Sequence, residues 1–436
     1  MAFLLNAIYL SLLAVGLPYF LYLAIKRGKY RQGWSEKFFG SLPKRSGDQP
    51  CAWFHAVSVG EVLQLGPLLQ QFRDRNPDWA IVVTTTTKTG MSVAREKYPN
   101  VTTCYCPLDF SWAVNRALNR IRPDLLVLVE LEIWPNLIRS AKNRAVRVAV
   151  VNGRISSKSF RGYQRAGWFF RWLLGKIDCV AAQNETYGER FAAFGVMPER
   201  LSVLGSIKFD GAETNRDNDT TQQLRRLAGI TSEDIVWLVG STMDPEEEVA
   251  LRVFRKIAPD YPQLKLILAP RHPDRCSELT GCLNATTKDW VLRSSLSEPA
   301  KSSPRILVVD TVGELKAWWG TADIAYVGGS WREGRGGQNM IEPAAYGAAV
   351  CFGPFTENFR DVVRGLLEEH AAVVVRREDQ LEAFVRQCVE DPNFREPLGE
   401  AAQHLVMQSA GATARTVDLL STLMGPGSVT SNSRAA

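Results

Sequence analysis

Short apolar runs alternate with amphipathic segments along most of this chain. Such runs occur at residues 51–57 (CAWFHAV), 79–87 (WAIVVTTTT), 124–130 (DLLVLVE) and 147–154 (RVAVVNGR), and each is followed by a stretch with helical spacing. Continuous apolar strands separated by single helices are typical of a parallel sheet that is covered on both faces. The pattern therefore predicts a doubly wound α/β domain in this part of the chain.

The same rhythm starts again after residues 211–222, a polar stretch without large apolar side chains that we interpret as a linker. We therefore expect two Rossmann-like domains, at residues 28–212 and 213–426, which face each other across a cleft. In sheets of this kind, ligands bind at the carboxyl ends of the strands. Residues 427–436 are polar and are expected to form a disordered tail.

The first 25 residues carry no charged side chain. As a helix they would measure about 37 Å, which exceeds the ~30 Å hydrocarbon core of a bilayer. A basic cluster follows directly, and the positive-inside rule then leaves the rest of the chain in the cytoplasm (Lys26, Arg27, Lys29, Arg31). We predict a membrane anchor helix at residues 1–27, rather than a cleaved signal peptide, because the charges follow the apolar run. Since Asn6 and Pro18 weaken the run, a helix lying in the membrane interface is the alternative.

Composition adds limits on chemistry and partners. The chain has 45% apolar residues, 22% charged residues and a formal net charge of +6. This mild basic excess suits a nucleotide, a phosphorylated lipid or a membrane surface, and it does not indicate nucleic acid. The eight cysteines form no CxxC pair, which favours free thiols in a reducing compartment. The four histidines lack metal-ligand spacing, so no metal site is expected. Neither a GxGxxG fingerprint after the first strand of either half nor a P-loop is present, which disfavours dinucleotide oxidoreductases and P-loop enzymes.

Polar residues follow several strands of the first half. Glu61 lies in a glycine-containing strand-to-helix turn, where it can act as a general base or simply stabilise the start of the helix. Glu130 and Glu132 follow another strand, and both face the cleft only if that strand continues past Glu130. Lys208 precedes the linker, where it is either a surface charge or a cation for a phosphate or carboxylate.

The second half carries the features of a nucleotide site. Arg271 and His272 end one strand and form a cationic pair that suits phosphate. Gly313 and Glu314 open a helix whose free backbone N–H groups form an anion site. A stretch with five glycines leads to a helix that we expect to start near Asn339, with Asn339 and Glu342 on one face to hold ribose hydroxyls. Since all of these end at one edge of one sheet, the sequence predicts a nucleotide site there.

Together these segments closely resemble one family, the 3-deoxy-D-manno-octulosonic acid (Kdo) transferases of lipopolysaccharide synthesis, which are membrane-anchored GT-B glycosyltransferases. The resemblance runs from the anchor to about residue 420. The motifs that carry it are HAVSVGE (55–61), ELEIWPNLI (130–138), GSIKFD (205–210), PRHPDR (270–275), DTVGEL (310–315) and GGSWREGRGGQNMIEPAA (328–345).

The resemblance implies transfer of Kdo from CMP-Kdo to a lipid A precursor, lipid IVA, with inversion at the anomeric carbon. Glu61 then matches the general base, and Glu130 and Lys208 match residues that support the transition state. A further set of residues matches the contacts to CMP: Arg271, His272, Val312, Gly313, Glu314, Asn339, Met340, Ile341 and Glu342. It also implies an enzyme of the cell inner membrane, with a single-pass anchor, catalytic domains on the cytoplasmic face and no bound metal.

Two positions depart from the family pattern. Gln338 stands where the family often has histidine in a Gly-Gly-His-Asn run, and Met243 stands where it often has histidine after Gly-Ser-Thr. Both lie in the expected donor domain, so they put contacts to the donor in doubt more than the fold. Two other interpretations stay open: a GT-B transferase with a different nucleotide sugar and a lipid acceptor, and an inactive membrane-tethered nucleotide-binding protein.

Overall fold

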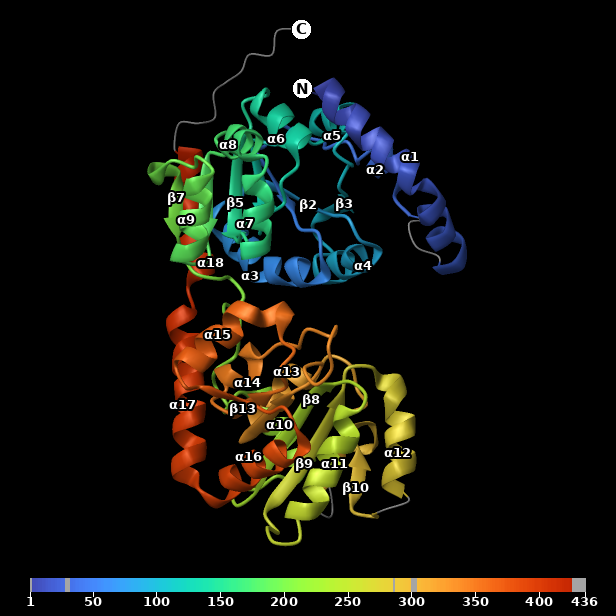
Figure 1. Cartoon of the computed structure of the whole chain (residues 1–436), viewed down its shortest axis with the longest axis vertical. Helices are drawn as coiled ribbons and strands as arrows, with labels where there is room; N and C mark the ends of the chain where they lie inside the picture. Colours follow the sequence, from blue (N-terminus) through green and yellow to red (C-terminus); the bar gives the residue numbers. More distant parts are fainter. Residues whose placement is uncertain (1, 28–31, 285–286, 299–303, 426–436) are drawn as a thin grey trace. The chain divides into compact units, whose positions relative to one another are not determined.

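The computed structural model describes residues 2–27, 32–284, 287–298 and 304–425, and these form two compact units (Figure 1). Unit 1 contains Met1–Asp210 together with Ala410–Ala436, and unit 2 contains Gly211–Ser409. The expected tail at 427–436, and Lys29 and Arg31 of the basic cluster, lie outside the described residues. All eight cysteines are free thiols.

Unit 1 is built on a parallel sheet with the strand order β3-β2-β1-β4-β5-β6-β7. The strands are β1 (Cys51–His55), β2 (Ala80–Thr85), β3 (Thr102–Tyr105), β4 (Leu125–Val129), β5 (Arg147–Gly153), β6 (Cys179–Ala182) and β7 (Leu201–Val203). The helices are α1 (Ala2–Arg27), α2 (Trp34–Phe39), α3 (Val59–Arg75), α4 (Lys88–Lys97), α5 (Ser111–Ile121), α6 (Pro135–Lys142), α7 (Ser157–Gln164), α8 (Gly167–Leu174), α9 (Glu185–Ala193) and α18 (Ala412–Met424).

Alternate residues of these strands enter two different cores. Trp53 of β1 packs in a cluster with side chains of α5, α6, α8 and α9, whereas its neighbour Phe54 packs in a cluster with α3, α4 and α18. This follows from the two-residue period of a strand, which sends successive side chains to opposite faces of the sheet. The predicted parallel sheet with two covered faces is therefore confirmed for the first half of the chain.

The C-terminal helix α18 belongs to unit 1, whereas the sequence analysis placed residues up to 426 in the second domain. Val417 and Leu420 are buried in the core that contains Phe54, and Arg75 of α3 forms an ion pair with Asp418 of α18. The apolar face of an amphipathic helix does not specify which of two sheets it covers, so this assignment required the structure.

Helix α1 is long and apolar enough to cross a membrane, with a mean hydropathy of 1.7 over Ala2–Tyr19. Its first turns also contact α5. Asn6 Nδ2 donates to Ser111 Oγ at 2.8 Å, and Asn6 Oδ1 accepts from the Ser111 backbone N–H at 3.0 Å. Tyr9 donates to Asp109 at 3.0 Å. Asn6, which interrupts the apolar run of the sequence, thus forms two hydrogen bonds with the first residue of α5 in unit 1.

Unit 2 repeats the architecture, with the parallel strand order β10-β11-β9-β8-β12-β13-β14. The strands are β8 (Ile235–Thr242), β9 (Leu264–Pro270), β10 (Trp290–Leu292), β11 (Ile306–Val308), β12 (Ile324–Val327), β13 (Ala349–Phe352) and β14 (Ala372–Val374). The helices are α10 (Asp219–Leu227), α11 (Glu246–Ile257), α12 (Cys276–Asn284), α13 (Leu315–Trp318), α14 (Ile341–Ala345), α15 (Arg360–Glu368), α16 (Glu378–Glu390) and α17 (Pro392–Ser409). Helices α11, α12 and α16 cover one face of this sheet.

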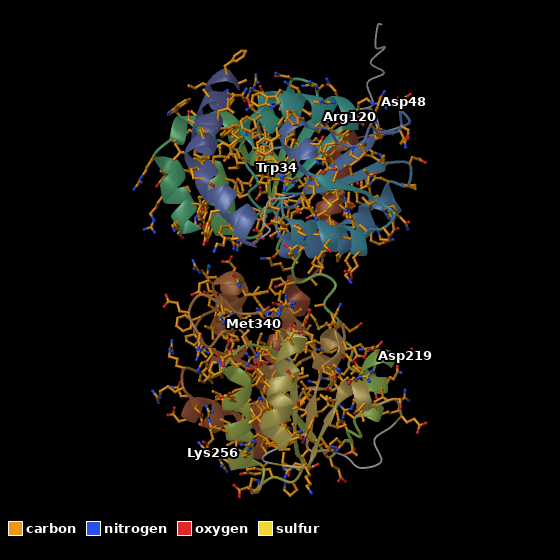
Figure 2. All side chains as sticks on the ribbon, turned by 90° about the vertical axis from the view of Figure 1, so that its right-hand side faces the viewer. Trp34, Asp48, Arg120, Asp219, Lys256 and Met340 are labelled. Atoms are coloured by element: carbon orange, nitrogen blue, oxygen red, sulfur yellow. The ribbon has the colours of Figure 1, made fainter. Side chains whose placement is uncertain are left out.

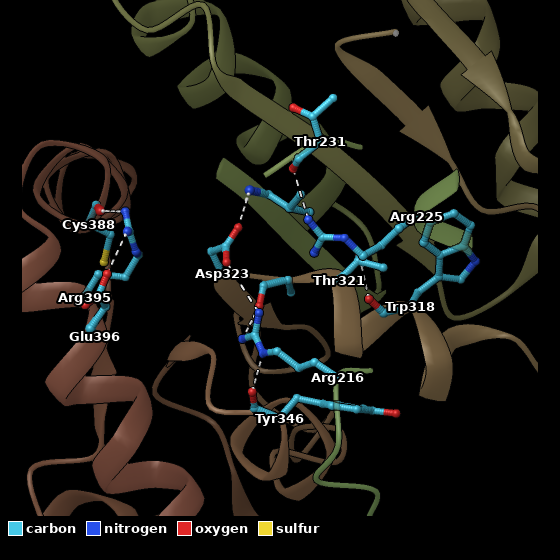
Figure 3. Close-up of polar contacts among 12 residues, drawn as sticks. Arg216, Arg225, Thr231, Trp318, Thr321, Asp323, Tyr346, Cys388, Arg395 and Glu396 are labelled. Atoms are coloured by element: carbon cyan, nitrogen blue, oxygen red, sulfur yellow. Dashed lines mark hydrogen bonds and ion pairs between the residues drawn. The ribbon is translucent and has the colours of Figure 1, made fainter. Parts of the chain in front are cut away.

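The polar stretch expected to be a linker is fastened to unit 2 by Arg216 (Figure 3). Its guanidinium donates to the backbone carbonyls of Tyr346 at 2.6 Å and Ala322 at 2.7 Å, and it pairs with Asp323 at 3.4 Å. The stretch also contains the start of α10, where the Asn218 side chain accepts from the Thr221 N–H. Residues 211–222 are therefore a polar, ordered part of unit 2 that has its own hydrogen bonds.

Candidate functional site

The carboxyl edge of the unit 1 sheet presents Glu61 in the turn between β1 and α3. The Val57 N–H donates to Glu61 Oε2 at 2.8 Å, and the Ser58 hydroxyl donates to Oε1 at 2.7 Å. Ser58 is the N-cap of α3 and accepts from the Glu61 N–H in return, so the pair forms a capping box. Burial raises the pKa of Glu61, the two hydrogen bonds lower it, and the charge of Glu130 raises it further. Glu61 therefore caps the helix and is at the same time a partly buried carboxylate held in one orientation.

Glu130 and Lys208 are brought together at the same edge. Lys208 Nζ lies 3.5 Å from Glu130 Oε1, and Arg154 Nη2 lies 3.2 Å from Glu130 Oε2. Strand β4 ends at Val129, and Glu130 has a left-handed backbone with φ of 59°. A non-glycine residue in this conformation costs about 1 kcal/mol or more and is found disproportionately at functional sites. The Arg154 side chain is 33% exposed and the Lys208 side chain is 16% exposed. The three charged groups therefore form a network that is partly shielded from bulk water.

Asn152 at the end of β5 positions the segment that carries Lys208. Its Oδ1 accepts from the Ser206 hydroxyl and from the Ile207 N–H, both at 3.3 Å, and its Nδ2 donates to Gln64 of α3 at 3.1 Å. Asn152 also has a left-handed backbone, with φ of 54°. One buried amide therefore links the strand that precedes Arg154, the Lys208 segment and the helix that carries Glu61.

Glu132 belongs to the same group of carboxylates. The strand ends before Glu130, and the charges of Glu61 and Glu130 still act on Glu132, so Glu132 lies near both of them. Glu132 Oε2 accepts from Trp134 Nε1 at 2.9 Å and lies 3.9 Å from His55 Nε2. Burial first, and then the charges of Glu61 and Glu130, raise the pKa of Glu132 to about 7.

The corresponding edge of unit 2 carries most of the residues that were predicted to bind a nucleotide. Arg271 and His272 follow β9 and are exposed, and the Arg271 N–H donates to the carbonyl of Thr242 at 2.9 Å. Burial raises the pKa of Glu342, whereas the charges of Lys316 and Arg271 and hydrogen bonds from the Asn339 and Trp319 side chains lower it. The structure therefore groups Arg271, Asn339 and Glu342, three of the predicted residues, in one neighbourhood.

The segment around Asn339 differs in detail from the expectation. Helix α14 begins at Ile341, two residues later than predicted, and the Asn339 side chain accepts from the Ile341 N–H at 3.1 Å. Met340, which is labelled in Figure 2, and its neighbour Ile341 are buried in unit 2, with 0% and 2% exposure, so neither residue presents surface to a ligand in this structure. In the turn after β11, Val312 is 83% exposed, Gly313 has φ of 91°, and Glu314 is paired with Arg293 at 2.8 Å.

A buried carboxylate, Glu246, organises the glycine-rich segment of this edge. Its Oε2 accepts from the backbone N–H of Gly329 at 2.7 Å and of Met243 at 2.8 Å. Its Oε1 accepts from the N–H groups of Ser330 and Trp331, both at 3.0 Å. A side chain at the preceding Gly328 would meet the backbone of Ser241 and Thr242 at 2.6 Å, which explains the glycine.

Sequence reasoning did not single out Arg154 or Glu246. Arg154 directly follows the apolar run of β5, and its place at a strand end was the available signal. Glu246 is one of three consecutive glutamates at the start of α11, where acidic residues are common because they stabilise the helix dipole. Glu246 and Glu247 are both buried, and nothing in the local sequence distinguishes them from the exposed Glu248.

Comparison with known sequences gives one consistent set of relatives. A family model described as 3-deoxy-D-manno-octulosonic-acid transferase matches residues 32–211. A 3-deoxy-D-manno-octulosonic acid transferase of Haemophilus influenzae is 32% identical over 94% of this chain and 97% of that protein. The protein of the same name from Bordetella pertussis is 33% identical over 86% of this chain and 87% of its own length.

Solved structures of low sequence identity share the fold. The UDP-GlcNAc 2-epimerase of Neisseria meningitidis aligns with a TM-score of 0.58 at 11% identity, over 85% of this chain and all of that one. An Anabaena protein solved with UDP, HepE, aligns with a TM-score of 0.55 at 14% identity, over 86% of this chain and all of that one. With the two parallel sheets, these likenesses confirm the predicted GT-B fold class.

Proposed function

This chain belongs to the 3-deoxy-D-manno-octulosonic acid transferase family of glycosyltransferases, and from that premise we propose that it transfers Kdo from CMP-Kdo to the lipid A precursor lipid IVA with inversion at the anomeric carbon. In this proposal Glu61 is the general base, and Glu130 and Lys208 support the transition state. The observation that carries it is the group of partly buried, oriented charges at the carboxyl edge of the unit 1 sheet.

The surroundings of Glu61 suit general-base catalysis. A base works best when its pKa lies close to the working pH, and burial together with the charge of Glu130 moves the pKa of Glu61 upward. The hydrogen bonds from Val57 and Ser58 fix the carboxylate, which lowers the entropic cost of aligning it with an acceptor hydroxyl. Glu61 then removes the proton of that hydroxyl while the acceptor oxygen forms the new bond to the anomeric carbon and the bond to the CMP phosphate breaks.

Lys208 and Glu130 support this step electrostatically. Lys208 is held at 3.5 Å from Glu130, and its side chain is only 16% exposed. A cation that is fixed before the reaction starts needs no reorganisation when negative charge develops, and such groups contribute about 3 to 4 kcal/mol in comparable sites. We therefore propose that Lys208 faces the carboxylate of the donor sugar or a phosphate of the acceptor.

The donor nucleotide is assigned to the carboxyl edge of unit 2. Arg271 and His272 are exposed groups that suit the CMP phosphate, and the segments Val312–Glu314 and Asn339–Glu342 complete the proposed contacts. Glu246 supports this role, because it holds the backbone of Gly329 and Ser330 in place. The two departures from the family pattern lie close to these segments: Gln338 directly precedes Asn339, and the Met243 N–H donates to Glu246.

Helix α1 is proposed to attach the enzyme to the inner membrane, with the catalytic units on the cytoplasmic face. Phe3, Leu12 and Val15 are 91%, 65% and 82% exposed, which suits contact with lipid. A single-pass anchor would carry Asn6 and Tyr9 away from unit 1, whereas both contact it here. The contacts therefore favour a helix that lies in the membrane interface. Labelling of Phe3→Cys in sealed inverted vesicles separates the two, because only a spanning helix protects this position from a reagent on the cytoplasmic side.

A transfer assay tests the reaction directly. Full-length protein in membranes is supplied with tetra-acylated lipid A precursor and with CMP-Kdo generated in situ, and the lipid products are measured by mass spectrometry. We expect a mass gain of one or more Kdo residues, with none when UDP-sugars replace CMP-Kdo. Transfer from a UDP-sugar would favour the alternative donor, and CMP binding without transfer from either donor would identify the chain as an inactive nucleotide-binding member of the family.

A further inference from the structure

His55 is a fully buried histidine beside the carboxylate group of unit 1, and its protonation can be assigned from its neighbours. Its Nδ1 lies 3.2 Å from the backbone carbonyl of Thr84 and 3.0 Å from the Thr84 hydroxyl oxygen. A carbonyl oxygen only accepts hydrogen bonds, so Nδ1 carries the proton. Burial lowers the pKa of His55 to about 4, so the ring is neutral and Nε2 has a bare lone pair.

This lone pair lacks a hydrogen-bond partner among the described residues, although the side chain has no exposed surface. A buried polar atom left in this state costs about 1 to 3 kcal/mol. The charged or polar atom facing Nε2 is Glu132 Oε2, at 3.9 Å. A carboxylate oxygen and a bare ring nitrogen are both acceptors and repel each other, which is consistent with a distance longer than a hydrogen bond.

One proton satisfies both atoms. If Glu132 is a carboxylic acid, its O–H donates to His55 Nε2, and the same oxygen still accepts from Trp134 Nε1. The terminal torsion of a glutamate has a broad energy profile, so the carboxyl group can turn to close the gap. Trp134 also contacts the His55 ring edge-to-face, with centroids 5.8 Å apart, which fixes the plane of the imidazole.

The charges around Glu132 favour the protonated form. Glu61 of α3 and Glu130 of the preceding turn act on it as anions. Cys106, which directly follows β3, and Tyr163 of α7 act on it as neutral groups. Within the described residues of this group, the Arg154 and Lys208 cations balance the anions Glu61 and Glu130. A third ionised carboxylate would leave the group with a net negative charge.

We infer that Glu132 holds its proton against Nε2 of His55 when the site is ready to react, and that it serves the reaction as a neutral positioning residue. Because the proton shared by these carboxylates is then on Glu132, Glu61 stays ionised and able to act as a base. The edge also stays neutral toward anionic substrates. The kinetic part of this inference rests on the proposed transfer reaction, whereas the position of the proton does not.

The position of the proton is tested in the full-length protein with ¹⁵N-labelled histidine. The chain has four histidines, so His55 is assigned by comparison with a His55→Gln sample. Between pH 5.5 and 9 we expect His55 to stay neutral with the proton on Nδ1, and its Nε2 resonance to shift with an inflection near pH 7, where Glu132 loses its proton. Glu132→Gln should remove the inflection, because its amide donates to Nε2 at every pH. Glu189→Gln, an exposed glutamate of α9, should leave the inflection unchanged.

An Nε2 resonance without inflection, or a His55 ring that is protonated at pH 7, would overturn the inference. The pH profile of transfer provides the second readout. In the wild type, kcat/KM should fall about tenfold per pH unit above the inflection, and in Glu132→Gln this alkaline fall should be absent. Retention of the fall in Glu132→Gln would contradict the positioning role. A protein that shows the NMR inflection and no transfer from CMP-Kdo would refute the proposed reaction and leave the proton assignment intact.

Discussion

Replacement of Glu246 by glutamine tests whether this one carboxylate holds the glycine-rich segment of unit 2. Glu246 is 3% exposed, and each of its oxygens accepts from two backbone N–H groups. Glutamine has the same shape but presents an NH2 group on one side. In either orientation of the amide, two backbone donors then face another donor and lose their partner.

The magnitude follows from those two contacts. Hydrogen bonds to a charged group contribute about 1.5 to 3 kcal/mol each, so the loss of two amounts to about 3 to 6 kcal/mol, less the relief from no longer burying a charge. We expect the free energy of unfolding of unit 2 to fall by about 3 kcal/mol or more, which is a large share of the ~5 to 15 kcal/mol typical of a domain.

The assay combines urea unfolding with amide hydrogen exchange. Exchange should accelerate in peptides that cover residues 328–331, and CMP binding should weaken because the same segment leads to Asn339. Glu248→Gln is the matched control, since Glu248 lies on the same helix with a 63% exposed side chain. A Glu246→Gln variant that unfolds like the control, with unchanged exchange at residues 328–331, would show that the hydrogen bonds to Glu246 do not hold this segment.

Three further predictions follow from the contacts in unit 1. Glu132→Gln should leave the free energy of unfolding unchanged near pH 4.5 and raise it by up to about 3 kcal/mol at pH 8. The pKa of Glu132 rises from 4.5 to about 7 on folding, so the folded wild type is stabilised by the protonated carboxyl at low pH and loses that stabilisation as the pH increases through this range. An equal effect in urea unfolding at both pH values would contradict the pKa shift. Asn6→Ala should lower the free energy of unfolding by about 1 kcal/mol because Ser111 of α5 loses its hydrogen bonds to Asn6, while Ser11→Ala on the exposed side of α1 should have no effect. Equal unfolding curves for the two variants would show that α1 does not dock on α5 in solution. Lys208→Met should lower kcat about 100- to 1,000-fold with unchanged CMP affinity, whereas Lys88→Met, at an exposed position, should leave kcat unchanged. A change confined to KM would place Lys208 in binding rather than in transition-state support.

The sheets and the strand-end residues could be predicted because both depend on short-range patterns. Continuous apolar runs such as Leu125–Val129 are diagnostic of buried parallel strands, and residues that follow them must lie at the carboxyl edge. Glu61, Glu130 and Lys208 were placed in unit 1 in this way, and Arg271 and Glu342 in unit 2.

The remaining contacts depend on tertiary arrangement that no local pattern contains. Arg154 reaches Glu130 because β4 and β5 pair in one register, with Val129 opposite Val151. Glu246 is buried only because the segment after β12 folds over it. The sequence of helix α18 does not specify which of the two sheets it covers, and in the structure its apolar face packs in the core that contains Phe54. In each case the decisive partner is distant in the sequence.

The central claim is that Glu61 removes the proton of the acceptor hydroxyl. The most direct measurement is the single-turnover rate of Glu61→Gln with CMP-Kdo and lipid IVA, together with CMP affinity from titration. We expect the rate to fall by about 100- to 10,000-fold, the usual contribution of a general base, with CMP affinity unchanged because the proposed CMP contacts lie in unit 2. A variant that keeps the wild-type rate, or one that loses CMP binding together with turnover, would contradict the assignment of Glu61 as the base.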